Sequence, residues 1–256
     1  MRVVQRSVIG GFIALCGLSM TVIAAPLDQT VGQKLRIDLD RLAEPDPDTE
    51  RRPREMNFSR PRPRTADDIP NVPEGFSIDI FADGLDHARN MAVAPNGDVF
   101  IAEPTAGQIT VMRDTDSDGV ADEVFTYIDN LNMPHGIAFI DGAVLIGDKV
   151  GVHKYPYSDD GKVTPFSSVL LTPLGALGPP DMRFHWARNV VVHPDGLKFY
   201  VGVGSASNIG ENPLPHGTIQ EFPIEGGVGR AFASGMRVPT GVLFYPGTTD
   251  LYTVVN

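Results

Sequence analysis

The chain has 256 residues, of which 42% are hydrophobic and 21% charged, with 27 glycines, 22 prolines and one cysteine. This composition excludes a collagen, a long coiled coil and a fully disordered chain, and its many turn-forming residues favour an all-β protein over long helices. The formal net charge of −11 provides no basic surface for a nucleic acid and disfavours binding to an anionic membrane.

The first 25 residues have the pattern of a secretory signal peptide. Arg2 and Arg6 precede an uncharged apolar run over residues 8–24, which ends in small residues that suit cleavage. An uncleaved anchor is the alternative, but the run is shorter than the roughly 20 apolar residues of a membrane-spanning helix. We therefore expect residues 1–25 to be removed, leaving a periplasmic or secreted protein with no stable membrane span. Cys16 is lost with them, so no disulfide is expected.

Residues 26–70 are predicted to form an extended or disordered lead-in. The segment holds 9 basic and 10 acidic residues and repeated prolines, and over residues 60–64 arginine and proline alternate. Proline removes backbone donors and charges resist burial, so this segment has little with which to form a core. The arginines fit either a solvated spacer or a site for an anionic partner, and we favour the spacer.

Residues 71–256 contain 10 basic and 22 acidic residues and a motif that recurs four times. Each copy consists of a short apolar strand, a turn rich in Pro, Asn, Asp and Gly, and a second strand. The copies start at Asn90, Gly136, Asn189 and Gly241. Further short strands are predicted over residues 108–113, 123–128 and 217–222. A unit of roughly 50 residues with four strands is typical of a β-propeller blade, and the alternative, an irregular sandwich, would not repeat so regularly.

An acidic motif, residues 114–123, lies between the first two copies. In an Asp-x-Asp-x-Asp-Gly loop the glycine turns the chain so that side chains converge, and calcium takes about six to eight oxygen ligands. The predicted ligands are Asp114, Asp116, Asp118, the carbonyl of Val120, and Asp122 or Glu123. An EF-hand would need a glutamate where Phe125 stands, and two flanking helices. We expect a structural calcium site in an inter-strand loop, and the alternative is a solvated acidic turn.

The repeat also predicts which residues share the end of the central channel, because the loop that enters each blade opens there. Four residues before the four starts stand Asp86, Asn132, His185 and Arg237. One residue before them stand Arg89, His135, Arg188 and Thr240. Such a cationic cluster in an acidic domain fits an anionic ligand with His185 or His135 as general base, or salt bridges between blades that close the ring. The spacing alone does not decide between them.

Residues 202–208 form a third motif, built almost entirely of glycine, serine and alanine with Asn208 at its end. Small residues of this kind let a ligand approach the backbone closely. An ordinary β-turn is the alternative and the commoner explanation.

Seven stretches of this domain together resemble one known family. They are residues 72–76, 94–103, 113–123, 134–139, 185–189, 202–208 and 233–241. In order and spacing they are similar to the soluble quinoprotein glucose/sorbosone dehydrogenases, whose members are six-bladed propellers, and the similarity runs from about Val72 to the last residue. The resemblance implies a small-molecule sugar substrate, oxidation of a sugar or related alcohol or aldehyde, and pyrroloquinoline quinone (PQQ) bound with Ca²⁺ at the channel mouth. It also implies an electron acceptor of the cytochrome or quinone type.

The resemblance assigns roles to individual residues. A histidine followed closely by an arginine takes the substrate proton in that family, and this histidine falls on His185, which would also contact the cofactor. The family's cofactor-binding arginine falls on Arg237, and we add Arg188 as a further cofactor-binding residue. PQQ carries three carboxylates, which matches a cationic cluster.

Two features depart from the family pattern. Val238 stands where the family usually has asparagine, and the chain reaches only four copies at Asn256, so we expect an incomplete propeller. The family's cofactor-binding lysine would lie beyond that residue. The second hypothesis is therefore a non-catalytic, calcium-stabilised propeller that binds a ligand or partner. The third is a lactone hydrolase, which would place Glu, Asn and Asp at the channel, where histidines and arginines are predicted here.

Overall fold

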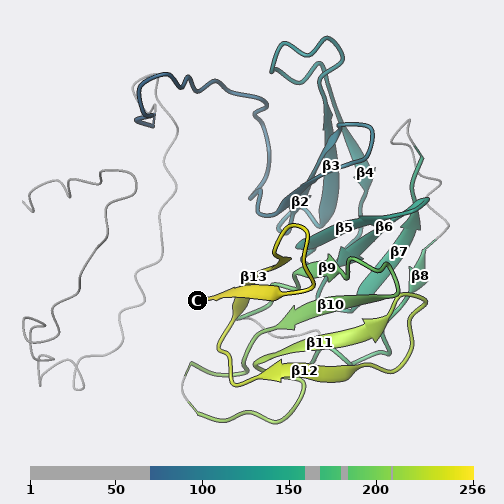
Figure 1. The fold of residues 1–256 in the computed structure, drawn as a ribbon. Helices are drawn as coiled ribbons and strands as arrows, with labels where there is room; N and C mark the ends of the chain where they lie inside the picture. The colour runs from purple at the N-terminus through teal and green to yellow at the C-terminus, as the bar shows by residue number, and fades with distance from the viewer. Residues whose placement is uncertain (1–69, 159–167, 180–183, 209) are drawn as a thin grey trace, which may run out of the picture. The chain divides into compact units, whose positions relative to one another are not determined.

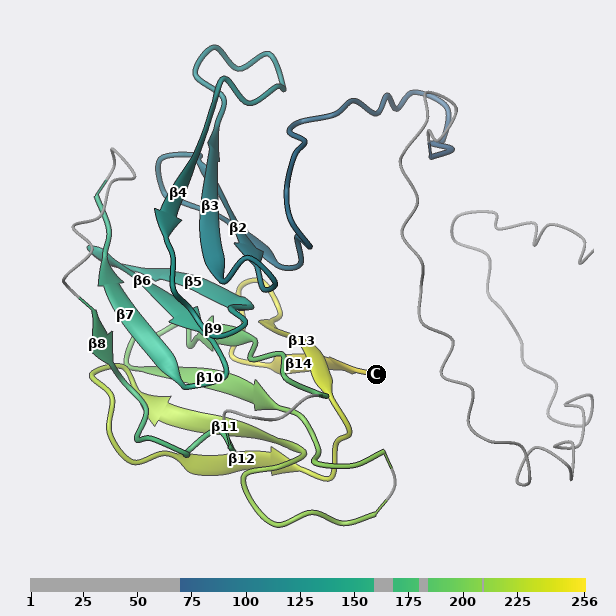
Figure 2. The same cartoon turned by 180° about the vertical axis from the view of Figure 1, so that it is seen from behind.

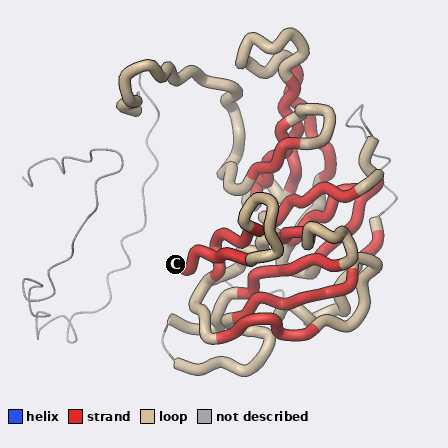
Figure 3. Tube along the Cα trace, viewed as in Figure 1, coloured by secondary structure: helices blue, strands red, loops and turns tan. Residues whose placement is uncertain are grey.

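The computed structural model describes residues 70–158, 168–179, 184–208 and 210–256 of a chain that divides into two units, Met1–Thr65 and Ala66–Asn256. The predicted signal peptide, and the predicted lead-in apart from Pro70, lie outside the described residues. Every regular element in the described part is a strand (Figures 1 and 3), which confirms the prediction of an all-β protein. A helix that could span a membrane does not occur in that part.

The strands form four antiparallel sheets that follow one another along the chain. The first contains β1 (Met91–Val93), β2 (Val99–Glu103), β3 (Gln108–Arg113) and β4 (Glu123–Ile128). The second contains β5 (Gly136–Ile140), β6 (Ala143–Gly147), β7 (Val152–Pro156) and β8 (Val169–Leu170). The third contains β9 (Val190–Val192), β10 (Lys198–Val203), β11 (Thr218–Pro223) and β12 (Arg230–Ser234), and the fourth β13 (Pro239–Phe244) and β14 (Leu251–Val255). The first strand of each sheet begins within two residues of a predicted repeat start.

The first strands of successive sheets lie beside one another: β1 contacts β5, β5 contacts β9, and β9 contacts β13. Sheets that each present their first strand to a common axis form a β-propeller. The predicted fold is therefore confirmed, with three four-stranded blades and a two-stranded fourth sheet. In Figures 1 and 2 the described sheets form an arc that does not close into a ring.

The core lies between the blades, and β6 shows how the sequence determines it. All five residues of β6 are buried. Because side chains alternate along a strand, Val144 and Ile146 pack into a cluster with the first blade, whereas Leu145 packs into a second cluster with the third blade. A strand covered on both faces needs a continuous apolar run, and this explains the uninterrupted run at residues 143–146.

Glycines occur where the main chains of neighbouring blades touch. A Cβ atom added at Gly136 would lie 2.3 Å from the carbonyl oxygen of Arg188, and one added at Gly147 would lie 2.6 Å from the same oxygen. On the next blade, a Cβ at Gly202 would lie 2.9 Å from the carbonyl oxygen of Pro239. Any larger residue at these positions would push the sheets apart. These contacts fix the spacing of the entry loops that carry the predicted channel residues.

Candidate functional site

The entry loops of the first two blades are held by matching hydrogen bonds to buried acids. The N–H of Asp86 donates to the carboxylate of Glu103, and the N–H of Asn132 donates to the carboxylate of Asp148 at 3.0 Å. Glu103 ends β2 and Asp148 directly follows β6, so the two loops are anchored in the same way. The predicted equivalence of Asp86 and Asn132 therefore has a structural basis. The sequence analysis missed Glu103 and Asp148. The feature that could have identified them is an acidic residue at the end of a buried apolar strand.

Both anchoring carboxylates are ionised despite their burial. Burial raises the pKa of Glu103, but hydrogen bonds from Thr110, Gln108 and the Asp86 N–H outweigh it, and the pKa lies below its ordinary value. For Asp148, burial is likewise outweighed, by hydrogen bonds from His153 and from main-chain N–H groups, and the pKa is again lowered. The hydrogen bonds that lower these pKa values include those that hold the two entry loops.

His185 is held in an unusual backbone conformation on the loop that enters the third blade. Its φ of 57° lies in the left-handed region, which costs a non-glycine residue about 1 kcal/mol or more. Its Nδ1 lies 2.8 Å from the carbonyl oxygen of Ser205, and its own carbonyl accepts a hydrogen bond from Arg188 at 3.0 Å. A carbonyl oxygen only accepts hydrogen bonds, so Nδ1 carries the proton. In the neutral ring Nε2 then has a lone pair, and no described residue is hydrogen-bonded to it.

Arg188 stabilises this loop through hydrogen bonds to main-chain carbonyl oxygens. Its side chain is fully buried, and its guanidinium donates to the carbonyl oxygens of His185, Ala187 and Leu177. Burial lowers its pKa to about 10, against the opposing field of Asp148, so it remains a cation at neutral pH. The structure places this predicted cofactor-binding residue inside the loop and gives it a role in fixing His185. Contact with a cofactor stays a prediction.

Arg237 and His185 come together at residues 205–208. The guanidinium of Arg237 donates to the side-chain oxygen of Asn208 at 2.8 Å and to the carbonyl oxygen of Asn256 at 3.0 Å. The carbonyl of Arg237 accepts a hydrogen bond from the N–H of Ser205 at 2.6 Å. Ser205 thus contacts two of the four residues that the sequence analysis placed four positions before a repeat start, His185 and Arg237.

His135 directly precedes β5 of the second blade, and its ring lies next to that of Trp186. Its ring centroid is 5.7 Å from that of Trp186, in an edge-to-face arrangement. Its Nδ1 is buried and has no hydrogen-bond partner among the described residues. Burial lowers the pKa of His135 to about 4, and the charges of Arg89 and Arg188 add to the effect. His135 is therefore neutral at physiological pH, and its buried Nδ1 remains without a partner among the described residues.

Two arginines of the predicted cluster have no acidic partner in the part of the chain that the structure describes. Arg89 donates from Nε to Nε2 of His87 at 3.0 Å, and His87 in turn contacts the hydroxyl of Thr105 at 2.7 Å. Arg237 contacts an amide and a carbonyl oxygen. Among the described residues, neither arginine forms an ion pair, whereas Arg113, Arg230, Lys154 and Lys198 each pair with an acid. Among the residues that the structure describes, no salt bridge therefore joins these entry loops, which favours an anionic ligand over the alternative of salt bridges between blades.

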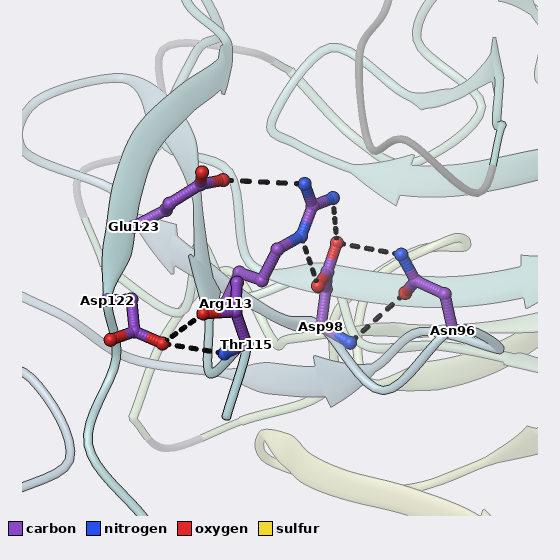
Figure 4. Close-up of polar contacts among 6 residues, drawn as sticks. All are labelled: Asn96, Asp98, Arg113, Thr115, Asp122 and Glu123. Atoms are coloured by element: carbon purple, nitrogen blue, oxygen red, sulfur yellow. Dashed lines mark hydrogen bonds and ion pairs between the residues drawn. The ribbon is translucent and has the colours of Figure 1, made fainter. Parts of the chain in front are cut away.

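The acidic motif connects β3 to β4. Carboxylate oxygens of Asp114, Asp116 and Asp122 lie within 4.8 Å of one another, close enough to share one cation. Asp118 is not in this group, and its carboxylate accepts a hydrogen bond from the N–H of Val120 at 2.8 Å. Asp122 is also bound by the N–H and hydroxyl of Thr115 (Figure 4), and these bonds lower its pKa. The structure therefore assembles three of the predicted calcium ligands.

Comparison with known proteins places the fold in context. The sequence model of a domain of unknown function, DUF7133, matches residues 65–175. No curated protein sequence matches the chain. A carbohydrate-active enzyme of family AA12 from Trichoderma reesei has a similar structure, at 19% identity and a TM-score of 0.65, over 77% of this chain and 52% of that one. The PQQ domain of a pyranose dehydrogenase from Coprinopsis cinerea matches at 19% identity and a TM-score of 0.57, over 68% of this chain and 44% of that one.

A calcium-containing structure of the Trichoderma reesei enzyme matches at 20% identity and a TM-score of 0.58, over 69% of this chain and 47% of that one. The chain thus spans about half the length of the structures it matches. At these identities the similarity establishes the propeller fold.

Proposed function

We propose that this propeller binds PQQ at its entry loops and oxidises a sugar or a related alcohol or aldehyde, as the quinoprotein sugar dehydrogenases that it resembles do. The observation that carries the proposal is the state of His185, which is fixed by Ser205 and Arg188 while its Nε2 has no hydrogen-bond partner among the described residues. Residues 1–25 support a periplasmic or secreted location for this activity.

The residues present fit an anionic cofactor. Arg89 and Arg237 have no acidic partners among the described residues, and the buried Nδ1 of His135 is unused. PQQ has three carboxylates, which are the natural partners of guanidinium groups. Arg237 would hold the cofactor together with His185, and Arg188 would keep the His185 loop in place.

The chemistry required of the chain itself is proton transfer. When bound, PQQ supplies an acceptor for the hydride of the substrate. His185 accepts the hydroxyl proton of the substrate at Nε2, and the carbonyl of Ser205 stabilises the resulting imidazolium through Nδ1–H. Arg188 keeps the His185 carbonyl, and with it the strained backbone, in position during this transfer.

We also propose a structural calcium site in the loop between β3 and β4. Asp114, Asp116 and Asp122 would supply carboxylate oxygens, with Asp118 and the carbonyl of Val120 completing the set. Bound calcium would rigidify this exposed loop and neutralise its repulsive negative charges.

A non-catalytic, calcium-stabilised propeller is the second candidate. It is favoured by one observation, that Arg89 and Arg237 form no ion pair among the described residues, because this arrangement requires only an anionic ligand. Such a protein would bind an anionic ligand at Arg89 and Arg237 and perform no oxidation.

One experiment tests the proposal and separates the two candidates. The full chain is mixed with PQQ and CaCl₂, and binding is followed by quenching of Trp186, the only tryptophan. Turnover of aldoses is followed by reduction of an artificial dye. His185→Gln, whose amide can still contact the cofactor, is expected to bind PQQ but to lose at least about 100-fold in kcat because it has no basic nitrogen, whereas Arg237→Gln weakens binding.

The matched control is Arg230→Gln, which removes an exposed arginine paired with Glu221. Quenching without turnover would support the binding propeller, and an absence of quenching would overturn both the cofactor and the oxidation.

A further inference from the structure

The segment after β10 contacts both His185 and Arg237. The proposed function assigns proton transfer to the first and cofactor binding to the second. β10 ends at Val203, and Gly204 and Ser205 follow it, both buried. His185 precedes the third blade, and Arg237 precedes the fourth. Residues from two separate entry loops therefore meet on one short segment that belongs to neither loop.

Ser205 uses each of its polar groups within this junction. Its carbonyl accepts the Nδ1–H of His185 at 2.8 Å, and its N–H donates to the carbonyl of Arg237 at 2.6 Å. Its hydroxyl donates to the carbonyl of Ser207 at 2.7 Å and lies 3.1 Å from Nδ1 of His185. The same residue therefore orients the imidazole and attaches it to the loop that carries Arg237.

Gly204 permits the close approach that these bonds require. A Cβ atom at this position would lie 2.5 Å from the Cβ of His185 and 2.6 Å from its carbonyl oxygen. Cβ atoms do not approach other atoms this closely, so an alanine here would displace His185 from Ser205.

We propose that Ser205 is a positioning residue that holds His185 in the Nδ1–H tautomer and so makes Nε2 the basic nitrogen. Gly204 allows the close approach that this contact needs. The proposal rests on the proposed function for the importance of Nε2. The tautomer itself follows from the Ser205 carbonyl alone, because the hydrogen bond at one ring nitrogen determines which nitrogen is protonated. In this proposal the motif at residues 202–208 holds His185 and Arg237 in place. The sequence analysis considered instead an ordinary turn or a direct contact with a ligand.

The test reads the tautomer directly by long-range ¹H–¹⁵N NMR of ¹⁵N-histidine-labelled full-length protein at pH 8. The His185 signal is identified by its absence in His185→Gln. We expect the proton on Nδ1 in the wild type and a mixture of tautomers in Gly204→Ala. The control is Gly241→Ala, where a new Cβ would be 3.8 Å from its nearest neighbour and the tautomer should be unchanged.

Kinetics provide the second measurement. With PQQ and CaCl₂ present, Gly204→Ala is expected to lower kcat about 10- to 100-fold while KM changes less than about threefold, because a displacement near 1 Å misaligns the base. A wild-type His185 protonated on Nε2, or a Gly204→Ala protein with an unchanged tautomer, would overturn the proposal even if the protein oxidises sugars. An inactive wild type with the expected tautomer would overturn the proposed function and leave the positioning role standing.

Discussion

The guanidinium of Arg113 forms a two-pronged ion pair with the carboxylate of Asp98, with Nε 2.8 Å from Oδ1 and Nη2 2.6 Å from Oδ2 (Figure 4). Asp98 is 4% exposed and lies in the turn before β2, whereas Arg113 ends β3 and directly precedes the acidic loop. This hydrogen-bonded ion pair is the main reason that the pKa of Asp98 is lowered, against the opposing effect of burial. The pair thus joins the proposed calcium loop to the hairpin beneath it.

Arg113→Gln removes the cation and leaves a buried carboxylate. We expect the free energy of unfolding at pH 7 to fall by about 1–3 kcal/mol. Because the folded pKa of Asp98 lies below its ordinary value of 3.8, the stabilisation is complete above that pH and is lost as the pH falls through the folded pKa. Urea unfolding of wild type and variant should therefore differ at pH 7 and converge below pH 3.8. Arg230→Gln, at an exposed ion pair, is the control and should change stability by less than about 1 kcal/mol.

His135→Gln should reduce the sensitivity of the protein to mild acid. The folded pKa of His135 is about 4 and its ordinary value is 6.5, so between these values the unfolded chain takes up a proton that the folded protein does not. The free energy of unfolding of the wild type therefore decreases as the pH falls across this window. For one such histidine the decrease is about 2 kcal/mol from pH 7 to pH 5. Urea unfolding should show that this fall is smaller in the variant. An identical fall in wild type and variant contradicts the prediction, and exposed His87→Gln serves as the control.

Calcium should stabilise the protein through the loop between β3 and β4. At a calcium concentration 100 times Kd, the expected gain in unfolding free energy is about 2.7 kcal/mol, visible as a higher Tm and reversed by EDTA. Asp114→Asn and Asp116→Asn should abolish this gain, because their oxygens belong to the cluster that spans 4.8 Å. Asp129→Asn, at an exposed acid directly after β4, should retain it. A calcium shift that survives both loop variants would mean that the ion binds elsewhere.

Gly147→Ala should loosen the packing of the second blade against the third. The added methyl would lie 2.6 Å from the carbonyl oxygen of Arg188 and 2.7 Å from a methyl of Val190. We expect a loss of about 1–3 kcal/mol in unfolding free energy, measured in urea. Gly241→Ala, whose new methyl meets only ordinary contacts, should stay within about 1 kcal/mol of the wild type. Equal stability of Gly147→Ala and wild type would show that the sheets can shift apart freely.

The fold was predictable because each blade repeats local signals. Turns such as residues 94–98 and 193–197 contain Pro, Asn or Asp and Gly at fixed offsets from two short apolar strands, and such turns determine a hairpin by themselves. The repeat then located the first strand of each described sheet, including β13 in the two-stranded fourth sheet. Local chemistry repeated at a fixed period is sufficient for this inference.

The site was predictable only in part. Register placed His185 and Arg237 in equivalent positions, but their connection through Ser205 depends on loops 20 residues and more apart in sequence, and spacing carries no information about that contact. Glu103 and Asp148 were missed for the same reason, because an isolated acid after an apolar strand does not reveal which N–H it binds. The repeat pattern also could not predict that Arg188 is buried, because arginines are usually exposed.

The glycine contacts between blades have a consequence for how new specificities arise on this scaffold. Since main chain touches main chain at Gly136, Gly147 and Gly202, the separation of the sheets does not depend on the size of any side chain in the entry loops. Loop residues can therefore be exchanged while the frame that carries them keeps its dimensions. A library that randomises exposed positions such as Asp86 and Arg89, and keeps these glycines, should yield a high fraction of folded variants with altered ligand preference.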